Sequence, residues 1–276
     1  MLNALSIDLE DYYHAESLKP SIQPEHWDGY RRRVRENTER ILALLKNYSV
    51  QATFFVLGWV AEREPDLIQE IHSQGHEIAC HGYSHKMITK QLPEEFRADL
   101  RKARGLIEPL IGQKLLGYRA PTFSIVKSTL WALDVLIEEG FVYDSSIFPI
   151  HHDRYGIPGA ERLPHQIKRD AGSIYEFPMS TLRIIGLNLP AGGGGYLRIL
   201  PYAYTQWAVG RLNRQQQPAM VYLHPWEIDL HQPRQALPLI TSFRHYYNLK
   251  HMEVKFKHLL RDFEFAPVAK VMGLLG

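Results

Sequence analysis

The sequence predicts an α/β protein in which parallel strands alternate with helices. Three observations point to this fold class. Short runs of β-branched and aromatic residues alternate with segments of helical periodicity from residue 2 to residue 143, a pattern typical of parallel strands covered by helices. Neither a repeat nor a linker divides the 276 residues, a length common for one α/β barrel. Clusters of acidic residues, histidine and arginine follow predicted strands, where such folds place their active sites.

The first half of the chain contains the clearest alternation. Each predicted strand is a short apolar run, and these runs cover residues 2–9, 51–57, 76–80, 116–119 and 141–143. The segments between them have helical periodicity over residues 37–45, 65–74, 93–111 and 128–139. The longest of these helices is expected to end at Gly112, because glycine commonly terminates helices.

The second half departs from this pattern. From about residue 150 to residue 200 the chain is rich in proline, glycine and histidine, which predicts long loops with short strands such as residues 173–177. A helix over 202–213, a buried strand over 219–223 and a charged helical tail over 243–263 are expected to follow.

Composition excludes several classes of protein. Apolar residues make up 45% of the chain and the net charge is +2, so the charge gives no reason to expect nucleic acid or an anionic membrane as the main partner. The single cysteine, Cys80, excludes an internal disulfide. The N-terminus lacks the features of a signal peptide, and no apolar stretch is long enough for a transmembrane segment. We therefore expect a cytoplasmic protein, and we interpret the basic run Arg31–Arg35 as a solvated helix face.

The strongest local signal is the segment His81-Gly82-Tyr83-Ser84-His85, directly after the predicted strand over 76–80. On a helical turn, two histidines four residues apart share one face and can bind one cation. Since the chain has 14 histidines, a chance pair on a surface turn is the alternative. The position after a buried strand favours a pair of metal ligands.

Three carboxylates, Asp8, Glu10 and Asp11, stand at the end of the first predicted strand. Such groups repel one another, and a cation or an arginine normally compensates them. The alternative is a solvated turn with an aspartate that caps a helix. Two histidines and one carboxylate would form a three-ligand site with open positions, which is typical of catalytic metals.

Two further residues stand at predicted strand ends. Arg119 precedes Ala120-Pro121, and the proline favours an extended chain before it. Arg119 is therefore placed to pair with a carboxylate, although an ordinary surface arginine is the alternative. His224 follows the apolar strand over 219–223, where it is suited to proton transfer or is simply a hydrogen-bonded core histidine.

Taken together, these segments resemble the polysaccharide deacetylase superfamily, which is carbohydrate esterase family four and is also called NodB-like. The resemblance follows the order of the family's motifs, in Asp8–Asp11, His81–His85, Arg119–Pro121, Asp144–Pro149 and Leu223–His224. It implies a distorted (β/α)7 barrel. It also implies a hydrolase that removes acetyl groups from an N-acetylated sugar of a polysaccharide or its lipid-linked precursor.

A narrower resemblance concerns one branch of this superfamily, which is encoded with exosortase and exopolysaccharide gene clusters. The segments that carry it are residues 8–13, 52–58, 224–229 and 243–249. It implies a role in exopolysaccharide biosynthesis and one deacetylase domain over 1–276, with 230–276 as a family-specific extension. Contact with the inner membrane face through the Arg31–Arg35 run is a further expectation, and a homo-oligomer is left open.

The resemblance also implies the ligands of a divalent metal, most readily Zn²⁺, with Co²⁺, Ni²⁺ or Fe²⁺ as alternatives. His81 and His85 correspond to two of them. The third is Asp11 or Glu10, because the family's usual pair of adjacent aspartates is interrupted here by Leu9. In a strand Glu10 points to the same side as Asp8, whereas a turn after Leu9 would bring Asp11 inward. The compact side chain of aspartate gives a narrow preference for Asp11.

The remaining roles follow from the same resemblance. Asp8 is expected to be the general base positioned by Arg119, and His224 the general acid that protonates the leaving amine. Glu227 or Asp229 is expected to fix the tautomer of His224 and keep it cationic. A backbone N–H near Tyr12 or Tyr143 is expected to stabilise the oxyanion. The candidates for contact with substrate are Tyr12, Phe123, Tyr143, Asp144, Trp226 and Glu227; for the aromatic ones, a role in the core is the alternative.

Two other functions compete with this one. The first is hydrolysis of a small amide by an allantoinase-like enzyme on the same barrel. The second is a catalytically inactive barrel that only binds glycans. Because Asp8, His81 and His224 are all present, both are less favoured than deacetylation.

Overall fold

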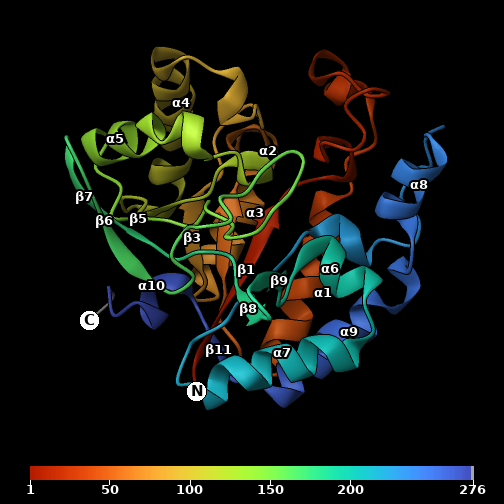
Figure 1. The fold of residues 1–276 in the computed structure, drawn as a ribbon. Coiled ribbons are helices and arrows are strands. Elements are labelled where there is room, and N and C mark those ends of the chain that lie inside the picture. Colours follow the sequence, from red (N-terminus) through yellow and green to blue (C-terminus); the bar gives the residue numbers. More distant parts are fainter. Residues whose placement is uncertain (275–276) are drawn as a thin grey trace.

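The computed structural model describes residues 1–274, and a sheet of mainly parallel strands organises them (Figure 1). In hydrogen-bonded order the sheet contains β10 (Met220–Leu223), β1 (Asn3–Leu9), β2 (Thr53–Val56), β3 (Glu77–Cys80), β4 (Gly117–Tyr118), β5 (Tyr143–Asp144), β7 (Gly172–Glu176) and β6 (His165–Arg169). The short β11 (Phe265–Ala266) also pairs with β1. Only β6 runs antiparallel to its neighbour in this sheet. The predicted α/β class with parallel strands is confirmed. Among residues 1–274 no pairing joins β10 to β6, so the strands form an open path.

The helices of the first half follow the strands, as predicted. They are α1 (Val34–Asn47), α2 (Gly58–Arg63), α3 (Pro65–Ser73), α4 (Pro93–Ile111) and α5 (Trp131–Glu138). In Figure 1, α4 and α5 lie together on one side of the strands. The bounds of α4 agree with the prediction, because Pro93 starts the helix and Gly112 ends it in a left-handed conformation with φ of 67°.

The second half contains more structure than the sequence predicted. A small hairpin of β8 (Thr181–Ile184) and β9 (Leu187–Pro190) precedes α6 (Gly194–Ile199) and α7 (Tyr202–Arg214). The tail forms α8 (Leu239–Tyr246), α9 (Leu249–Asp262) and α10 (Val268–Val271). The predicted single tail helix is broken at Asn248, which adopts a left-handed φ of 64°. Helix α9 packs on α6, and α8 lies at the edge of the molecule (Figure 1).

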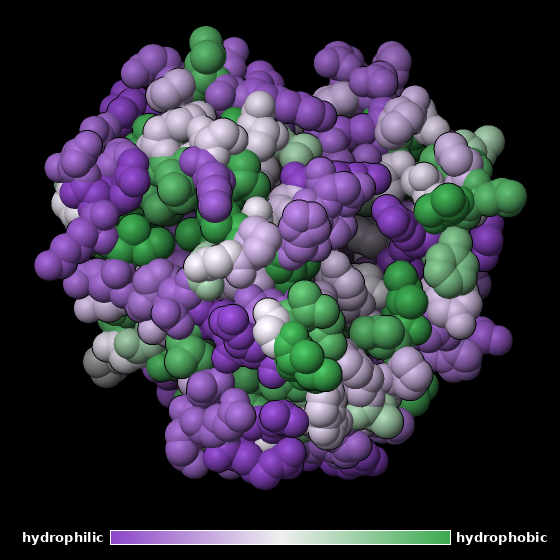
Figure 2. Space-filling view, in the orientation of Figure 1, coloured by the Kyte–Doolittle hydropathy of each residue, from purple (hydrophilic) through white to green (hydrophobic). Residues whose placement is uncertain are grey.

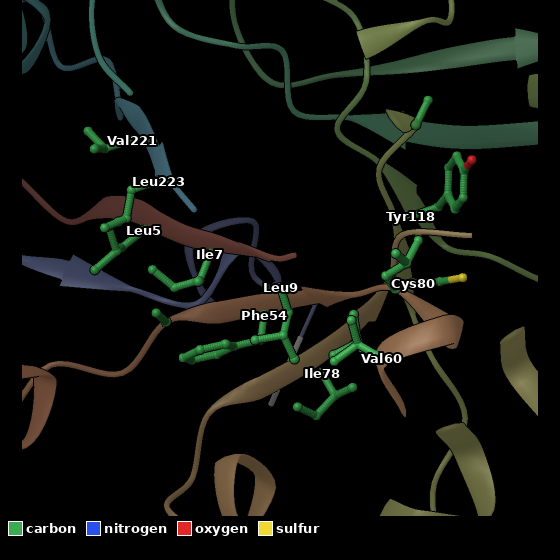
Figure 3. Close-up of a cluster of buried hydrophobic side chains, with 14 of the residues drawn as sticks. Leu5, Ile7, Leu9, Phe54, Val60, Ile78, Cys80, Tyr118, Val221 and Leu223 are labelled. Atoms are coloured by element: carbon green, nitrogen blue, oxygen red, sulfur yellow. The ribbon is translucent and has the colours of Figure 1, made fainter. Parts of the chain in front are cut away.

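Strand β1 lies between β10 and β2 in the sheet and is buried along its whole length. Its residues Leu5, Ile7 and Leu9 pack with Phe54 of β2 and Ile78 of β3 in the core between sheet and helices (Figure 3). Burial of each such side chain contributes about 1.5–3 kcal/mol. This burial fixes the register of β1, because a slip of one residue would move all three side chains to the other face.

The same register directs the alternate residues of β1 to the opposite face. Asp8 therefore lies on the inner side of the sheet, beside a second cluster that includes Phe55, Tyr143 and Tyr222. Because β1, β2, β3 and β10 are parallel neighbours, their carboxyl ends meet at one edge. The candidate site is built at this edge.

Candidate functional site

Three buried side chains form a group that fits a metal ion. Glu10 follows β1, and His81 and His85 follow β3. The Glu10 Oε1 atom lies 2.9 Å from His81 Nε2 and 2.8 Å from His85 Nε2. One potential ligand atom from each residue lies within 4.8 Å of the others. Two imidazoles and a carboxylate are the donor set of a catalytic transition-metal site.

The protonation states of Glu10 and His81 also fit the binding of a cation. The Nδ1 atom of His81 lies 2.8 Å from the backbone oxygen of Arg119. Because a carbonyl only accepts, Nδ1 carries the proton and Nε2 keeps its lone pair toward Glu10. Burial alone would raise the pKa of Glu10, but His85 and His81 outweigh it and hold that pKa well below its ordinary value. Glu10 is therefore an anion between two imidazole nitrogens.

The histidine pair is held by a loop rather than by the expected helical turn. Gly82 and His85 both adopt left-handed conformations, with φ of 73° and 51°. The Asp99 carboxylate of α4 accepts hydrogen bonds from the backbone N–H groups of Tyr83 and Ser84, at 2.7 Å and 3.1 Å. A non-glycine residue at positive φ costs about 1–3 kcal/mol. The anchored loop thus holds His85 in a strained conformation that turns its ring toward His81 and Glu10.

The preference for Asp11 as the third ligand needs correction. Asp11 is buried, and its Oδ2 accepts hydrogen bonds from the backbone N–H groups of Arg33 and Val34, at 2.6 Å and 2.9 Å. Its Oδ1 accepts from Tyr12 N–H at 2.8 Å and caps the short 3₁₀ helix η1 (Tyr12–His14). Asp11 therefore fixes the chain around the start of α1 while Glu10 faces the histidines.

The backbone at the end of β1 explains this choice. Glu10 N–H donates to the carbonyl of Asp8 at 2.9 Å, which closes a tight three-residue turn. The expected turn after the strand is present, but it directs Glu10 rather than Asp11 toward His81 and His85.

Asp8 and Arg119 form the predicted pair. The Asp8 Oδ1 atom lies 2.6 Å from Arg119 Nη1, and both side chains are almost fully buried. Arg119 also donates to the Ser6 hydroxyl at 2.7 Å and to the carbonyl and hydroxyl of Ser145 at 3.1 Å and 3.0 Å. Its guanidinium lies 4.0 Å from the centre of the Phe55 ring. These contacts fix Arg119 rigidly, so it determines the orientation of Asp8.

His224 lies across from Asp8, at the end of β10. Its Nε2 is 3.8 Å from Asp8 Oδ2, and its Nδ1 is 3.1 Å from Glu227 Oε2. Burial alone would lower the pKa of His224, but its hydrogen bond to Glu227 and the charges of Glu10, Glu227 and Asp8 raise that pKa to about 9. The ring is therefore held as a cation that can donate a proton.

Glu227 supports His224 from behind and is held in turn by Arg198 of α6. It lies in the 3₁₀ helix η6 (Pro225–Ile228) and is fully buried. Arg198 Nε lies 3.2 Å from Glu227 Oε1. The other nitrogens of Arg198 donate to the carbonyls of Arg244 and Tyr247, at 2.7 Å and 2.8 Å. The sequence prediction did not include Arg198, because no local pattern distinguishes it from a surface arginine.

A cavity of about 230 Å³ opens beside these groups. Asp8, Glu10, His85 and His224 line its inner part. His81 is not among its lining residues, although its Nε2 faces Glu10. The predicted general base, the predicted general acid and two of the three metal-ligand candidates thus face one space.

Only some of the predicted substrate contacts lie at this cavity. Phe123 and Trp226 line it. Tyr12 and Tyr143 are fully buried core residues, and the hydroxyl of Tyr143 donates to Glu77 Oε1 at 2.8 Å. The proposal that they contact substrate is therefore corrected to a structural role.

Two acidic residues proposed to contact substrate have structural contacts instead. Asp144 is fully buried and accepts a hydrogen bond from the Ser146 hydroxyl at 2.5 Å, so it shapes the loop after β5. Burial raises its pKa to about 6. Glu227 holds His224 and does not line the cavity. The expectation that it fixes the tautomer agrees with its contact at Nδ1.

Two segments that the sequence did not assign complete the cavity. The loop after β5 contributes His152, Arg154 and Tyr155, and α8 contributes Thr241, Arg244 and His245. The Trp226 ring is stacked between His224 and His245, with ring centres 5.1 Å and 4.6 Å away. The lining also contains the stacked rings of His152 and Tyr155, with centres 3.8 Å apart. The cavity therefore presents aromatic surfaces, which suit sugar rings.

Two family models match parts of this chain. A model described as polysaccharide deacetylase matches residues 27–136, which include His81 and His85. This part of the chain therefore resembles the polysaccharide deacetylase superfamily. A second model, described as a domain of unknown function, matches residues 145–273. This second region contains His224 and helix α8, while the family-specific extension over 230–276 stays a prediction. The superfamily resemblance is confirmed, whereas the association with exosortase stays a prediction.

Among curated proteins, a peptidoglycan-N-acetylglucosamine deacetylase of Bacillus cereus is 36% identical over 100 residues. The match covers 36% of this chain and 36% of that relative. The chain thus matches only about a third of the length of this polysaccharide deacetylase.

Solved structures show the same fold over nearly the whole chain. A Mycobacterium smegmatis protein described as a polysaccharide deacetylase has a TM-score of 0.65 at 20% identity, covering 99% of this chain and 89% of that one. The PuuE allantoinase has a TM-score of 0.60 at 15% identity, covering 96% and 86%. These likenesses support the fold expected of the polysaccharide deacetylase superfamily. Within residues 1–274, no helix has the length and apolar character needed to cross a membrane.

Proposed function

We propose that this protein is a metal-dependent N-deacetylase that hydrolyses the acetamido group of an N-acetylated saccharide. The observation that carries the proposal is the arrangement of Asp8 and His224, a base and a cationic acid, beside the Glu10–His81–His85 group. Amide hydrolysis needs such a pair, because one group must take a proton from water while another gives a proton to the leaving amine.

Glu10, His81 and His85 would hold the metal, and Zn²⁺ is our first choice, with Co²⁺, Ni²⁺ and Fe²⁺ as alternatives. When bound, a divalent cation would polarise the acetamido carbonyl and lower the pKa of a water molecule. The three protein ligands leave positions for substrate and water, as in catalytic sites. The anchor of His81 on the Arg119 carbonyl fixes the ring for this role.

Asp8 accepts the proton of the attacking water. Its Oδ1 is held by Arg119, while its Oδ2 lies 3.8 Å from His224 Nε2. Arg119 is a positioning residue, because its buried guanidinium contacts Asp8, Ser6 and Ser145 and does not line the cavity. His224 donates its Nε2 proton to the nitrogen of the departing amino sugar, and Glu227 balances the charge of its ring. The products are acetate and a free amino sugar.

The substrate proposed here is a saccharide because of the cavity walls. Trp226, Tyr155 and Phe123 line the space beside His224. The faces of the Trp226 ring are stacked against His224 and His245, so this ring contributes its edge to the lining. Aromatic surfaces of this kind pack on the apolar faces of sugar rings. The name of the Bacillus cereus relative supports N-acetylglucosamine units as the first saccharides to test.

The resemblance to the exosortase-associated branch supports a role in exopolysaccharide biosynthesis, with a polymer or a lipid-linked precursor as substrate. Exposed side chains of α8 support the lipid-linked form. Leu239 is 89% exposed and Ile240 71% exposed, and Figure 2 shows hydrophobic surface over α8 at the right of the view. The same helix lines the cavity through Thr241 and Arg244. A lipid chain attached to the sugar would meet this apolar surface.

The Arg31–Arg35 run does not support the expected membrane contact. Arg33 is buried and forms an ion pair with Asp229, while Arg32 and Arg35 pair with Glu64 at 3.1 Å and 2.8 Å. The interpretation as a solvated helix face is therefore wrong for Arg33, and peripheral membrane contact is better assigned to α8. The cytoplasmic location and a homo-oligomer stay predictions.

The fold likeness to PuuE allantoinase keeps hydrolysis of a small amide as the second candidate function. One experiment separates the candidates. The protein loaded with Zn²⁺ is incubated with N-acetylglucosamine oligomers and, separately, with allantoin, and acetate and allantoin consumption are measured. We expect acetate from the oligomers alone. Turnover of allantoin without acetate release would favour the second candidate, and glycan binding without any turnover would indicate an inactive barrel.

A further inference from the structure

The outer part of the cavity has two arginines whose charge is not balanced. Arg154 of the loop after β5 and Arg244 of α8 both line the cavity and are exposed to solvent. Within residues 1–274, neither guanidinium lies within 4.0 Å of a carboxylate oxygen. Burial lowers the pKa of His152, Asp153 opposes this, and Arg154 and Arg244 lower the pKa further, so both guanidinium groups lie near His152. Asp153 contacts His152 at 2.9 Å, and among the described residues the two arginines are left without an ion-pair partner of their own at the same end of the cavity.

The carboxylates of the cavity are already paired elsewhere. Asp8 is neutralised by Arg119 at 2.6 Å. Glu16, which lines the outer part, lies 2.5 Å from Lys19 Nζ and 3.3 Å from Lys90 Nζ. Glu16 therefore does not compensate the two arginines, and the surroundings of the outer cavity have an excess of positive charge.

The positive charge continues beyond the cavity. A neighbouring hollow of about 480 Å³ is also lined by Glu16, Ser17, Arg154 and Thr241. Its remaining lining includes Lys19 and Lys90. A saccharide that extends out of the cavity along this path would meet Arg154 and then the two lysines.

We propose that Arg154 and Arg244 form a subsite for an anionic group of the saccharide, either a carboxylate or a phosphate ester. This inference rests on the proposed function and names the class of its substrate. The planar guanidinium presents two parallel N–H donors, which match the oxygens of both groups. Because both arginines are exposed, each charge-assisted contact of this kind changes binding by about threefold, and the two together by about tenfold.

The test compares N-acetylated oligosaccharides that differ only in their charge. One is neutral, one carries a uronic acid in the neighbouring sugar, and one carries a phosphate ester at its reducing end. We expect kcat/KM to be about tenfold or more higher for at least one anionic substrate, and the two anionic substrates distinguish a carboxylate from a phosphate. The advantage should shrink as salt is raised, because both arginines are exposed.

Substitutions then assign the effect to the two arginines. Arg154→Gln and Arg244→Gln should each lower the ratio of anionic to neutral kcat/KM by about threefold. Arg183→Gln is the matched control, because Arg183 is exposed on β8 and does not line the cavity; it should leave the ratio unchanged. Equal kcat/KM for neutral and anionic substrates, or an unchanged ratio in both variants, would overturn the inference.

A binding measurement separates this inference from the proposed function. Calorimetric titration with the same anionic oligosaccharides lacking the acetyl group requires no turnover. Binding that weakens in Arg154→Gln and Arg244→Gln supports the subsite even if no substrate releases acetate, in which case the deacetylase proposal fails alone. If acetate is released while the anionic oligosaccharide binds no better than the neutral one, the subsite is refuted and the deacetylase proposal stands.

Discussion

Glu227→Gln tests how the protein keeps His224, the proposed general acid, protonated. The ordinary pKa of histidine, 6.5, is raised to about 9 at His224, and this difference corresponds to about 3 kcal/mol in favour of the protonated ring. Glu227 is the largest favourable contributor, through the contact of 3.1 Å at Nδ1. Its neutral isostere should remove about half of this energy, which lowers the pKa of His224 by about one unit.

The assay is acetate release by metal-loaded enzyme between pH 5 and pH 10. Because His224 must be protonated to act as the acid, kcat/KM falls as pH rises through its pKa. We therefore expect this alkaline decline to begin about one pH unit lower in Glu227→Gln than in the wild type. Glu64→Gln is the matched control, since Glu64 pairs with Arg32 and Arg35 rather than with His224. An alkaline decline at the same pH in Glu227→Gln and wild type would refute the reasoning.

The same pKa has a consequence for stability. Because the folded-state pKa of His224 is raised, its contribution is fully present below pH 6.5 and is lost as pH rises through about 9. The stability difference between wild type and Glu227→Gln should therefore be larger at pH 6 than at pH 10. Thermal denaturation at the two pH values measures it, and it also shows whether the variant is folded in the activity assay.

Three further predictions concern the metal and the base. His81→Ala should lower Zn²⁺ affinity at least about 100-fold and abolish acetate release, as measured by metal analysis and turnover; full activity in chelated protein would exclude the metal role. Asp8→Asn should fold and bind Zn²⁺ while kcat falls about 10²–10⁴-fold, and near-normal turnover would exclude Asp8 as the base. Glu10→Gln should lose Zn²⁺ binding, whereas Asp11→Asn should keep the metal. Asp11→Asn should lose about 1–3 kcal/mol of unfolding free energy, because the buried backbone N–H groups that donate to Asp11 lose their charged acceptor. Loss of Zn²⁺ binding in Asp11→Asn but not in Glu10→Gln would instead identify Asp11 as the ligand.

The helices of the first half could be predicted because their signals are local. In α4, amphipathic periodicity begins at Pro93 and ends before Gly112, and both residues act on their own turn. The break in the C-terminal helical tail could not be predicted. It occurs at Asn248, which adopts a left-handed conformation that asparagine does not always take. The sequence thus indicates where a helix is favourable but not where tertiary packing interrupts it.

The candidate site, too, could be predicted only in part. The pairing of Asp8 with Arg119 and the histidine pair followed from strand ends that parallel pairing brings together. The choice between Glu10 and Asp11 depends on backbone N–H groups of Arg33 and Val34, which lie more than 20 residues further along the chain. No periodicity or spacing encodes such a contact. The contributions of α8 to the cavity were missed for the same reason.

Arg198 links the docking of the C-terminal tail to the position of Glu227. One guanidinium holds Glu227 and also the carbonyls of Arg244 and Tyr247 around the end of α8. The free energy that docks the tail and the free energy that orients the acid are therefore coupled, and such coupling is reciprocal. A saccharide bound between His224 and α8 should slow hydrogen exchange at the amides of α8. Conversely, any event that loosens α8 should weaken proton donation by His224, so the tail is able to tune the rate without touching the reacting atoms.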